Sequence, residues 1–456
     1  MRLRSLALAL ALLGALAGCG PKILWSGHTD DRARRVEIVK DGDESYVVID
    51  GTRSRAYRGI AVGSLVFAGS HVAFAHRAGD RWAVSLDGTP GPTFDSIGEI
   101  ALSASGHIAY AAERAGAWHV VRDGVVGAAV TSVLARTLQL AGDRVVYVAQ
   151  RANATHVVVD DAFGPAFDGV QQLVTSPSHI AYIGRRGDEM VVVRDGVESR
   201  AWSSIDRLAL AGPRIAYAAT DGDLWRVVTD AATFAPVDKV HGIWIRDDGA
   251  HVAWLASIGS TRTLALDAIP LVVSPTLRET AIAFRPTRAG TADVGLAYAE
   301  RAADGDHIVL DGVAGPAFDE VRVPVWNAAG RMAYTARRGR TWFVVYNGLE
   351  HGHAEWVSDP VLADDGTLAY VRRDRRRTQV VVDRMAYPFD FVFEDTLVVA
   401  SRTRWAIAAG DVARKAVYIA VGTRRVPVPS IELYASAVNG NPSDELKRWT
   451  RRELGL

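Results

Sequence analysis

The feature that most constrains this chain is a unit of about 36 residues that recurs along nearly its whole length. Its clearest copy is His107–Gly124, HIAYAAERAGAWHVVRDG, in which two runs rich in β-branched and aromatic residues flank a small polar turn. That pattern is typical of a β-hairpin. Consecutive copies lie 35 to 37 residues apart, with one interval of 44, and a fixed period of this size indicates a repeat architecture. Each copy ends in an acidic or amide residue: Asp50, Asp87, Asp123, Asp160, Asp195, Asp230, Asp267, Asp311, Asn347 and Asp383.

Each unit reads as four short strands, and the aromatic residue of the second strand recurs with the same period. The series is Phe74, Tyr110, Tyr147, Tyr182, Tyr217, Trp254, Tyr298, Tyr334 and Tyr370. Ten complete units are followed by a degraded eleventh at Leu397–Gly410. We therefore predict an all-β chain, a β-propeller of about ten to eleven four-stranded repeats of ~36 residues with a short C-terminal helix.

Propellers usually have four to eight blades, so this count allows either one unusually wide ring or two smaller rings in tandem. No linker rich in Pro, Gly and Ser separates two halves of the chain, and a hairpin insertion near Arg285–Asp293 accounts for the one long interval. These observations favour a single ring. Ser443–Leu454 is predicted to be the helix, because Ser443 suits its N-cap and basic residues suit its last turns.

The turn before the second strand carries a motif. SASGHIAY at Ser103–Tyr110, RDDGAHVAW at Arg246–Trp254, NAAGRMAY at Asn327–Tyr334 and ADDGTLAY at Ala363–Tyr370 resemble the S-P-D-G-x-x-I-A-[YF] signature of TolB-type, WD40-like propeller repeats. The resemblance covers nearly the whole chain after its N-terminal segment. It implies the propeller fold and leaves the function open, because this repeat serves many unrelated roles.

The N-terminus has the sequence of a bacterial lipoprotein signal. Arg2 and Arg4 precede an apolar run, Leu6–Leu16, and Leu-Ala-Gly-Cys follows, which resembles a lipobox ending at Cys19, the only cysteine. The resemblance implies lipidation of Cys19 and a bacterial cell-envelope location, and Gly20 after the cysteine favours the outer membrane. We predict a signal peptide over 1–18, a lipidated Cys19 and tether over 19–34, propeller repeats over 35–436 and a helical tail over 437–456.

A second motif, Gly-Pro-x-Phe-Asp, occurs in alternate units. It stands at Gly91–Asp95, Gly164–Asp168 and Gly315–Asp319, with relatives at Pro236–Asp238 and Pro388–Asp390. We interpret it as the trace of an ancestral two-blade duplication. The Asp is expected to brace a turn and the aromatic residue to pack between neighbouring blades.

Most residues that could carry chemistry occupy repeat positions, which argues against one convergent site. His71, His107, His179 and His251 share one position, and His119, His156 and His307 share another, so we expect structural roles for them. His351 and His353 could share a strand face and bind Zn²⁺ as a pair, but no third ligand is evident. The Asp-Gly-Asp triplets at 41–43, 221–223 and 304–306 suit hairpin turns better than calcium loops. We predict no cofactor and no bound metal.

The turn between the two central strands is rich in arginine. Because equivalent turns of a propeller emerge on one face, these residues could form a basic surface for lipid phosphates, anionic glycan or an acidic protein. The charges are nevertheless balanced at 52 basic and 52 acidic residues, which gives no reason to expect nucleic-acid binding. The predicted binding residues are Arg77, Arg114, Arg151, Arg185, Arg186, Arg301, Arg337, Arg338, Arg340, Arg372, Arg373, Arg375, Arg376 and Arg377.

The sequence therefore favours a non-catalytic propeller lipoprotein that serves as a binding or assembly platform for protein or anionic envelope ligands. The alternative is a hydrolase or lyase acting on polysaccharide or peptide at the central channel. Residues that depart from the repeat would have to supply such a site, and the candidates are His241, Glu279, His351 and His353.

Overall fold

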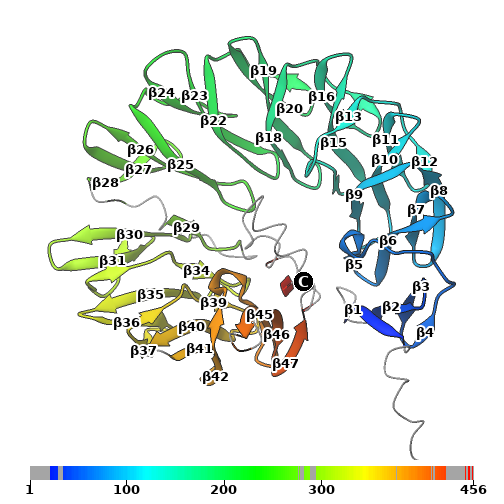
Figure 1. The fold of residues 1–456 in the computed structure, drawn as a ribbon. Helices are drawn as coiled ribbons and strands as arrows, with labels where there is room; N and C mark the ends of the chain where they lie inside the picture. The colour runs from blue at the N-terminus through cyan, green and yellow to red at the C-terminus, as the bar shows by residue number, and fades with distance from the viewer. Residues whose placement is uncertain are drawn as a thin grey trace, which may run out of the picture. The chain divides into compact units, whose positions relative to one another are not determined.

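The structure is a computed structural model of the 456-residue chain, and it describes residues 21–28, 34–275, 277, 282–287, 294–375, 377–411, 413, 416–427, 447, 450, 451 and 454. These residues form eleven antiparallel sheets, which we call blades, in two compact units that divide after Leu138. Within this described part, no helix has the length and apolar character needed to cross a membrane. Figure 1 shows the strands in chain order.

The first unit contains three blades, each a meander of four strands that pair in chain order. A short 3-10 helix, η1 (Val62–Ser64), precedes the second blade. The strands are β1 (Lys22–His28), β2 (Arg35–Asp41), β3 (Glu44–Ile49) and β4 (Thr52–Arg53); β5 (Val66–Ala68), β6 (His71–Ala78), β7 (Arg81–Leu86) and β8 (Thr89–Phe94); and β9 (Ser96–Leu102), β10 (Ile108–Arg114), β11 (Ala117–Arg122) and β12 (Val125–Val126), with β13 (Ser132–Val133) after them.

The second unit contains the other eight blades, which are antiparallel sheets of three to five strands. Those up to β32 are β14 (Gln139–Ala141), β15 (Arg144–Arg151), β16 (Ala154–Val159) and β17 (Ala162–Phe163); β18 (Gly169–Thr175), β19 (Ile180–Arg186), β20 (Glu189–Arg194) and β21 (Val197–Glu198); β22 (Ser204–Ala211), β23 (Arg214–Thr220) and β24 (Trp225–Thr229); β25 (Lys239–Ile245), β26 (Val252–Ile258), β27 (Thr261–Leu266) and β28 (Ile269–Ser274); and β29 (Ile282–Phe284), β30 (Leu296–Ala302), β31 (Gly305–Leu310) and β32 (Val313–Ala314).

In the last three blades the first strand is split in two, and both pieces pair with the same central strand. These blades are β33 (Glu320–Val321), β34 (Val325–Trp326), β35 (Met332–Arg338), β36 (Thr341–Tyr346) and β37 (Leu349–Ala354); β38 (Trp356–Val357), β39 (Val361–Leu362), β40 (Leu368–Asp374), β41 (Arg377–Val382) and β42 (Met385–Phe389); and β43 (Phe391–Val392), η3 (Glu394–Thr396), β44 (Val398–Ser401), β45 (Arg404–Asp411), β46 (Ala416–Val421) and β47 (Arg424–Pro427).

The predicted fold class is confirmed: the chain is an all-β propeller with about eleven blades of mostly four antiparallel strands. The eleventh unit, weak in sequence, is a complete blade. The single ring stays a prediction. The insertion expected near Arg285–Asp293 falls largely outside the described residues, and so does most of the predicted C-terminal helix. Its four described residues, Lys447, Thr450, Arg451 and Leu454, have helical backbone.

The predicted tether over residues 19–34 is wrong in its extent. Lys22–His28 forms β1, which pairs antiparallel with β2 from Lys22 opposite Lys40 to His28 opposite Arg35. A first blade needs a first strand, and this segment supplies it with Ile23 and Trp25 in the ladder. Only Gly20 and Pro21 therefore separate Cys19 from the propeller. Cys19 itself and the predicted signal peptide lie outside the described residues.

The acidic residue that closes each unit is a brace built into the central hairpin. In the Asp-Gly turn after β11, Asp123 and Gly124 have φ angles of 48° and 84°, the left-handed pair that a tight hairpin turn requires. Asp123 Oδ1 accepts a hydrogen bond of 2.9 Å from the Ile108 amide, and the Asp123 amide donates to the Ile108 carbonyl. Equivalent carboxylate bonds to one of the first two amides of the second strand occur at Asp87, Asp160, Asp195, Asp230, Asp267 and Asp311.

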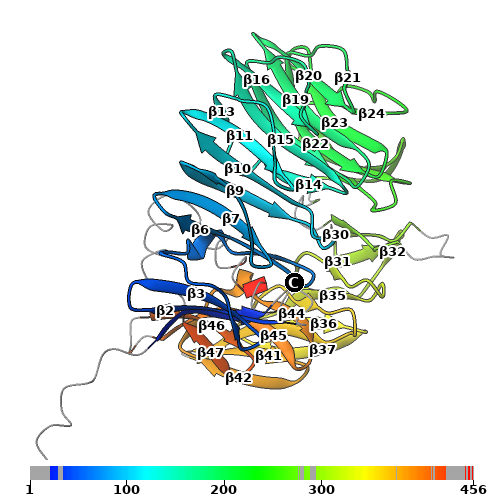
Figure 2. The same cartoon turned by 90° about the vertical axis from the view of Figure 1, so that its right-hand side faces the viewer.

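Neighbouring blades of each unit pack face to face through apolar side chains. Tyr217 of β23, for example, lies in one buried cluster with Ile183 of the preceding blade and Trp202 of the connection between them. Figure 2 shows these blades, in teal and green, stacked on one another. One face of a blade packs against the preceding blade and the other face packs against the following blade. The central strands are therefore buried on both faces.

The brace gives a first prediction. Asp195 accepts hydrogen bonds from the Ile180 amide (2.9 Å) and from His179 Nδ1 (2.7 Å). We expect Asp195→Ala to lower the free energy of unfolding by roughly 1–3 kcal/mol, because it leaves the Ile180 amide unpaired. Asp195→Asn should recover most of this loss, since its amide oxygen can still accept from Ile180. Urea denaturation at pH 7 measures both changes.

The stabilisation that Asp195 contributes, measured as the loss in Asp195→Ala, is also predicted to depend on pH. Burial acts to raise the pKa of Asp195, but the bonds from His179 and Ile180 outweigh it and hold the pKa below its ordinary value of 3.8. The stabilisation is therefore present above that ordinary value and is lost as the pH falls through the lowered pKa of the folded state. Asp188→Ala, in the exposed hairpin turn of the same blade, is the control. Equal losses for the two alanine variants would show that the brace contributes nothing.

Candidate protein-binding surface

The repeated histidines have the structural roles expected of them. His71, His107, His179 and His251 each place Nδ1 at 2.7–3.0 Å from the closing Asp of their own blade. His119, His156 and His307 instead place Nδ1 at 2.8–3.0 Å from the carbonyl of Gly127, Gly164 or Gly315, beyond the third strand. Both series tie neighbouring strands of one blade together.

The Gly-Pro-x-Phe-Asp motif links each blade that carries it to the blade that follows. Its Asp accepts a hydrogen bond from an amide in the hairpin turn of the next blade, at Ala115 (2.7 Å), Gly187 (2.6 Å), Gly259 (2.6 Å) and Gly339 (2.5 Å). Its Phe packs edge-on against the aromatic residue of that blade, with 6.1 Å between the ring centres of Phe94 and Tyr110. The predicted turn brace and inter-blade contact are therefore both observed.

The Ala115 amide also affects the charge of this motif. Its hydrogen bond to Asp95, with a smaller contribution from Arg81, holds the pKa of Asp95 below its ordinary value. The Asp is therefore ionised at neutral pH and acts as a fixed acceptor.

The hairpin-turn arginines, which we predicted as a binding surface, mostly contact their own blade or a neighbouring one. Arg186 is the fullest case: its guanidinium lies 4.2 Å over the Phe167 ring and donates two hydrogen bonds to Glu198, at 2.8 and 2.6 Å. These bonds keep the pKa of Glu198 below its ordinary value. Arg186 Nε also donates to the Ala166 carbonyl at 3.0 Å. Such a side chain fastens the fourth strand to the central hairpin.

Other predicted arginines repeat parts of this arrangement. Their partners are the Asp80 carbonyl and Trp82 ring for Arg77, the Thr93 carbonyl and Phe94 ring for Arg114, the Phe163 ring for Arg151, the Gly187 carbonyl for Arg185, Asp306 for Arg301, Glu320 for Arg337, Glu350 for Arg338, Gln379 for Arg372 and Glu394 for Arg373. Arg340, Arg375 and Arg377 are exposed on two neighbouring blades, and the Arg375 amide donates to Glu355 at 2.7 Å. Arg376 lies outside the described residues. An anionic ligand at these turns stays a prediction.

The histidine pair at 351 and 353 does not share a strand face, contrary to the alternation we assumed. Gly352 between them has a φ of 69° and the register of β37 against β36 shifts there, so a bulge interrupts the alternation. His351 lies against Tyr346 and His353 against Phe343, which are on opposite faces of β36. His353 Nε2 is 3.0 Å from Glu350.

The other residues proposed for a channel enzyme are not brought together in the described structure. His241 is buried in β25 with Nε2 3.1 Å from the Ser257 hydroxyl, and Glu279 lies outside the described residues. In the part of the chain that the structure describes, no three His, Cys, Asp or Glu side chains are grouped so that they could hold a metal ion.

The structure shows a different feature that we did not predict, a row of exposed apolar side chains beside the closing turns. In four consecutive blades of the second unit, the fourth strand begins with an apolar residue that is more than half exposed: Ile269 (67%), Val313 (73%), Leu349 (61%) and Met385 (52%). We call these four residues and Leu271 the apolar edge. The sequence signal was available, because the triplets Asp311-Gly312-Val313 and Asn347-Gly348-Leu349 put an apolar residue where the turn ends.

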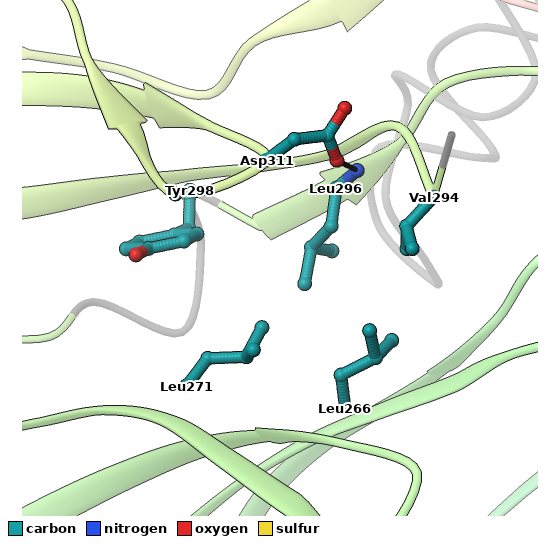
Figure 3. A pocket seen from close by; sticks show the side chains of 7 residues that line it. Leu266, Leu271, Val294, Leu296, Tyr298 and Asp311 are labelled. Carbon is teal, nitrogen blue, oxygen red and sulfur yellow. Dashed lines mark hydrogen bonds between the residues drawn. The ribbon is translucent and has the colours of Figure 1, made fainter. Parts of the chain in front are cut away.

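A hollow of about 320 Å³ opens beside this edge, between the blades of β25–β28 and β29–β32 (Figure 3). Leu266 and Leu271 line it from one blade, and Leu296 and Tyr298 line it from the other. Asp311 stands above Leu296 in Figure 3, and its carboxylate accepts a 2.9 Å hydrogen bond from the Leu296 amide. The hollow is thus apolar inside, with one braced carboxylate at its margin, and its shape and lining suit an apolar side chain better than a polar substrate.

Comparison with known proteins gives no family assignment: no family model matches the chain, and no curated protein matches it. Solved structures that are similar include the Dos1 propeller, with 10% identity over 77% of this chain and 90% of that chain and a TM-score of 0.27. Another is Hsv2 from Kluyveromyces lactis, with 9% identity over 90% of this chain and 100% of that chain and a TM-score of 0.23. A third is an extracellular domain, BT4673, from B. thetaiotaomicron (10% identity, TM-score 0.26). This chain spans 64% of that domain's length, and the match covers 86% of this chain.

The arginine contacts give a second prediction. Arg186→Gln should lower the free energy of unfolding by about 1 kcal/mol, because it removes the cation stacked on Phe167 and the partly exposed ion pair with Glu198. Glu198→Gln should cost a similar amount, and the double variant should cost less than the sum of the two. Arg340→Gln, at an exposed turn position, serves as the control and should leave stability unchanged. Thermal or urea unfolding of the four variants decides whether the turn arginines are structural.

Proposed function

We propose that this protein is a non-catalytic, lipid-anchored propeller of the bacterial envelope that binds a partner protein through the apolar edge. The observation that carries the proposal is the alignment of four exposed apolar residues at one repeat position with an apolar hollow beside them. Singly exposed apolar residues are ordinary on protein surfaces, whereas a contiguous group is typical of an interaction site.

The geometry suits a protein better than a small ligand. Ile269, Val313, Leu349 and Met385 begin the fourth strands of four consecutive blades, so they present one apolar contact per blade. A partner that spans several blades could meet them all and place one larger side chain in the hollow, which gives a buried anchor surrounded by weaker contacts. Asp311 and the neighbouring turn carboxylates would form the polar margin of that interface.

The proposed anchor is supported by sequence alone. Leu16–Cys19 has the residues of a lipobox, and Arg2, Arg4 and the apolar run before it have the proportions of a signal peptide. Several acyl chains on one residue would hold the protein stably at a membrane, because each buried methylene adds roughly 0.8 kcal/mol. Gly20 favours the outer membrane by resemblance to sorted lipoproteins.

A photo-crosslinking experiment tests the binding surface. A photoreactive amino acid replaces Val313 in the full chain expressed in its native host, and adducts are sought in the envelope fraction after irradiation. The expected result is a specific adduct that disappears when Leu271→Asp is also present, because a charge at the hollow disfavours an apolar side chain. Leu271→Asp alone should leave the amount of folded protein within about twofold of wild type, since Leu271 is 44% exposed.

The matched control is Ile258, which is 62% exposed at the hairpin-turn end of β26. A photoreactive residue there has similar exposure but lies at the other end of the blade. Adducts of equal strength at 258 and 313, or none at 313, would rule out the apolar edge as the binding surface.

The anchor is tested separately with Cys19→Ser. Wild-type protein should partition into the membrane fraction and carry the mass of its acyl groups, whereas the variant should be released or retained as an uncleaved precursor. Intact-mass spectrometry of detergent-extracted protein measures this. An unmodified thiol at Cys19 in the membrane-extracted wild type would contradict lipidation.

A further inference from the structure

The first blade places the proposed anchor next to one particular end of the propeller. β1 begins at Lys22 and runs antiparallel to β2, which ends at Asp41, so Lys22 lies beside the Gly42–Asp43 hairpin turn. Gly20 and Pro21 alone join Lys22 to Cys19. Because an extended chain spans at most ~3.6 Å per residue, the Cα atoms of Cys19 and Lys22 are within about 11 Å. The anchor therefore has very little slack.

The other end of the same blade is much farther from the anchor. β3 runs six residues, from Glu44 beside the hairpin turn to Ile49 beside the Asp50–Gly51 turn. At ~3.3 Å per residue, this separates the two turns by about 20 Å. A lipid held at Cys19 thus brings the hairpin-turn end of this blade to the bilayer before the other end can reach it.

Two lysines at this end are suited to that position. Lys22 and Lys40 stand directly opposite each other in the β1–β2 ladder, both exposed, and neither has an ion-pair partner among the described residues. Like charges directly across a ladder are unfavourable unless an anion lies between or beside them. Lipid phosphate groups would supply that anion, and a lysine ammonium binds phosphate as a point charge.

The acidic groups of the same turn are largely engaged elsewhere. Asp41 accepts a 3.0 Å bond from Arg53, and Glu44 accepts a hydrogen bond from the Tyr46 hydroxyl. Asp43 is exposed at the tip of the turn. The end as a whole has mixed charge, so the short anchor sets the contact and the two lysines supply the attraction to the bilayer.

We propose that the hairpin-turn end of the first blade lies on the surface of the anchoring membrane, with Lys22 and Lys40 against lipid phosphate groups. This inference rests on the anchor of the proposed function. It specifies which end of the first blade is occupied by the membrane and leaves that blade's Asp50–Gly51 turn, about 20 Å away, facing the aqueous compartment.

The test couples the chain to vesicles at its single cysteine, so that it does not depend on acylation in the cell. The chain beginning at Cys19 is joined through its thiol to maleimide-bearing lipid in vesicles of phosphatidylethanolamine and phosphatidylglycerol at a ratio of 3:1. A donor fluorophore is placed through an unnatural amino acid at Asp43 or at Thr52, which are exposed at opposite ends of the first blade. Energy transfer to acceptor-labelled headgroups is then measured for each position.

Transfer from position 43 should exceed that from position 52 about twofold or more, because of the separation along β3. Equal transfer, or more transfer from 52, would overturn the proposed orientation. Because the coupling is chemical, that result would leave the acylation of Cys19, tested by Cys19→Ser, unaffected.

The lysines are tested in the same assay with the double variant Lys22→Gln/Lys40→Gln. The difference between positions 43 and 52 should shrink, and 0.5 M salt should shrink the wild-type difference similarly. Arg35→Gln, a cation at the opposite end of β2, is the matched control and should leave the difference intact. A difference unchanged by the double variant would overturn the phosphate contact of the two lysines.

Discussion

The structure depends on one hydrogen bond repeated along the chain, from an amide at the start of a central strand to the carboxylate that closes the hairpin. In the bond between the Ile108 amide and Asp123, one residue has two roles. Asp123 adopts the left-handed turn conformation, and its carboxylate also fixes where the strand begins. This bond sets the register of the central hairpin. The outer strands then pair with a ladder that is already aligned, and the apolar faces of adjacent blades stack in consistent register.

The same repetition explains why residues with catalytic potential are abundant here and yet do not form an evident active site in the described part of the chain. His107 is hydrogen-bonded to the closing Asp123, and Asp168 accepts a hydrogen bond from the hairpin turn of the next blade. Arg186 stacks on an aromatic ring and pairs with Glu198 of the fourth strand. In each case the charged or titratable group is bonded within its own blade or to a neighbouring one. Among the side chains that the blades leave exposed at regular intervals are apolar ones, such as Val313 and Leu349, and these form the binding surface that we propose.

Much of the fold could be predicted because a repeat records its structure many times. The closing residues and the strand aromatics gave the blades, and the Gly-Pro-x-Phe-Asp motif gave the inter-blade contact. The first strand was assigned to a tether, whereas the pairing of Lys22–His28 with β2 makes it a full member of the first blade. The His351–His353 pair failed for another reason: a bulge at Gly352 depends on the local ladder, which periodicity cannot reveal. The hollow beside Leu271 depends on the fit of two blades and has no counterpart in a single unit.

The local character of the closing bond has a consequence for how the chain folds. Ile108 and Asp123 are only 15 residues apart, and the same separation recurs from blade to blade. Contacts of such short range need little loop-closure entropy, so each hairpin can form by itself and recruit its neighbours afterwards. A chain of this kind resembles a one-dimensional array in which order can start at any repeat and spread in either direction. A chain that is synthesised from its N-terminus can therefore assemble its blades in sequence, before the last repeat has been made.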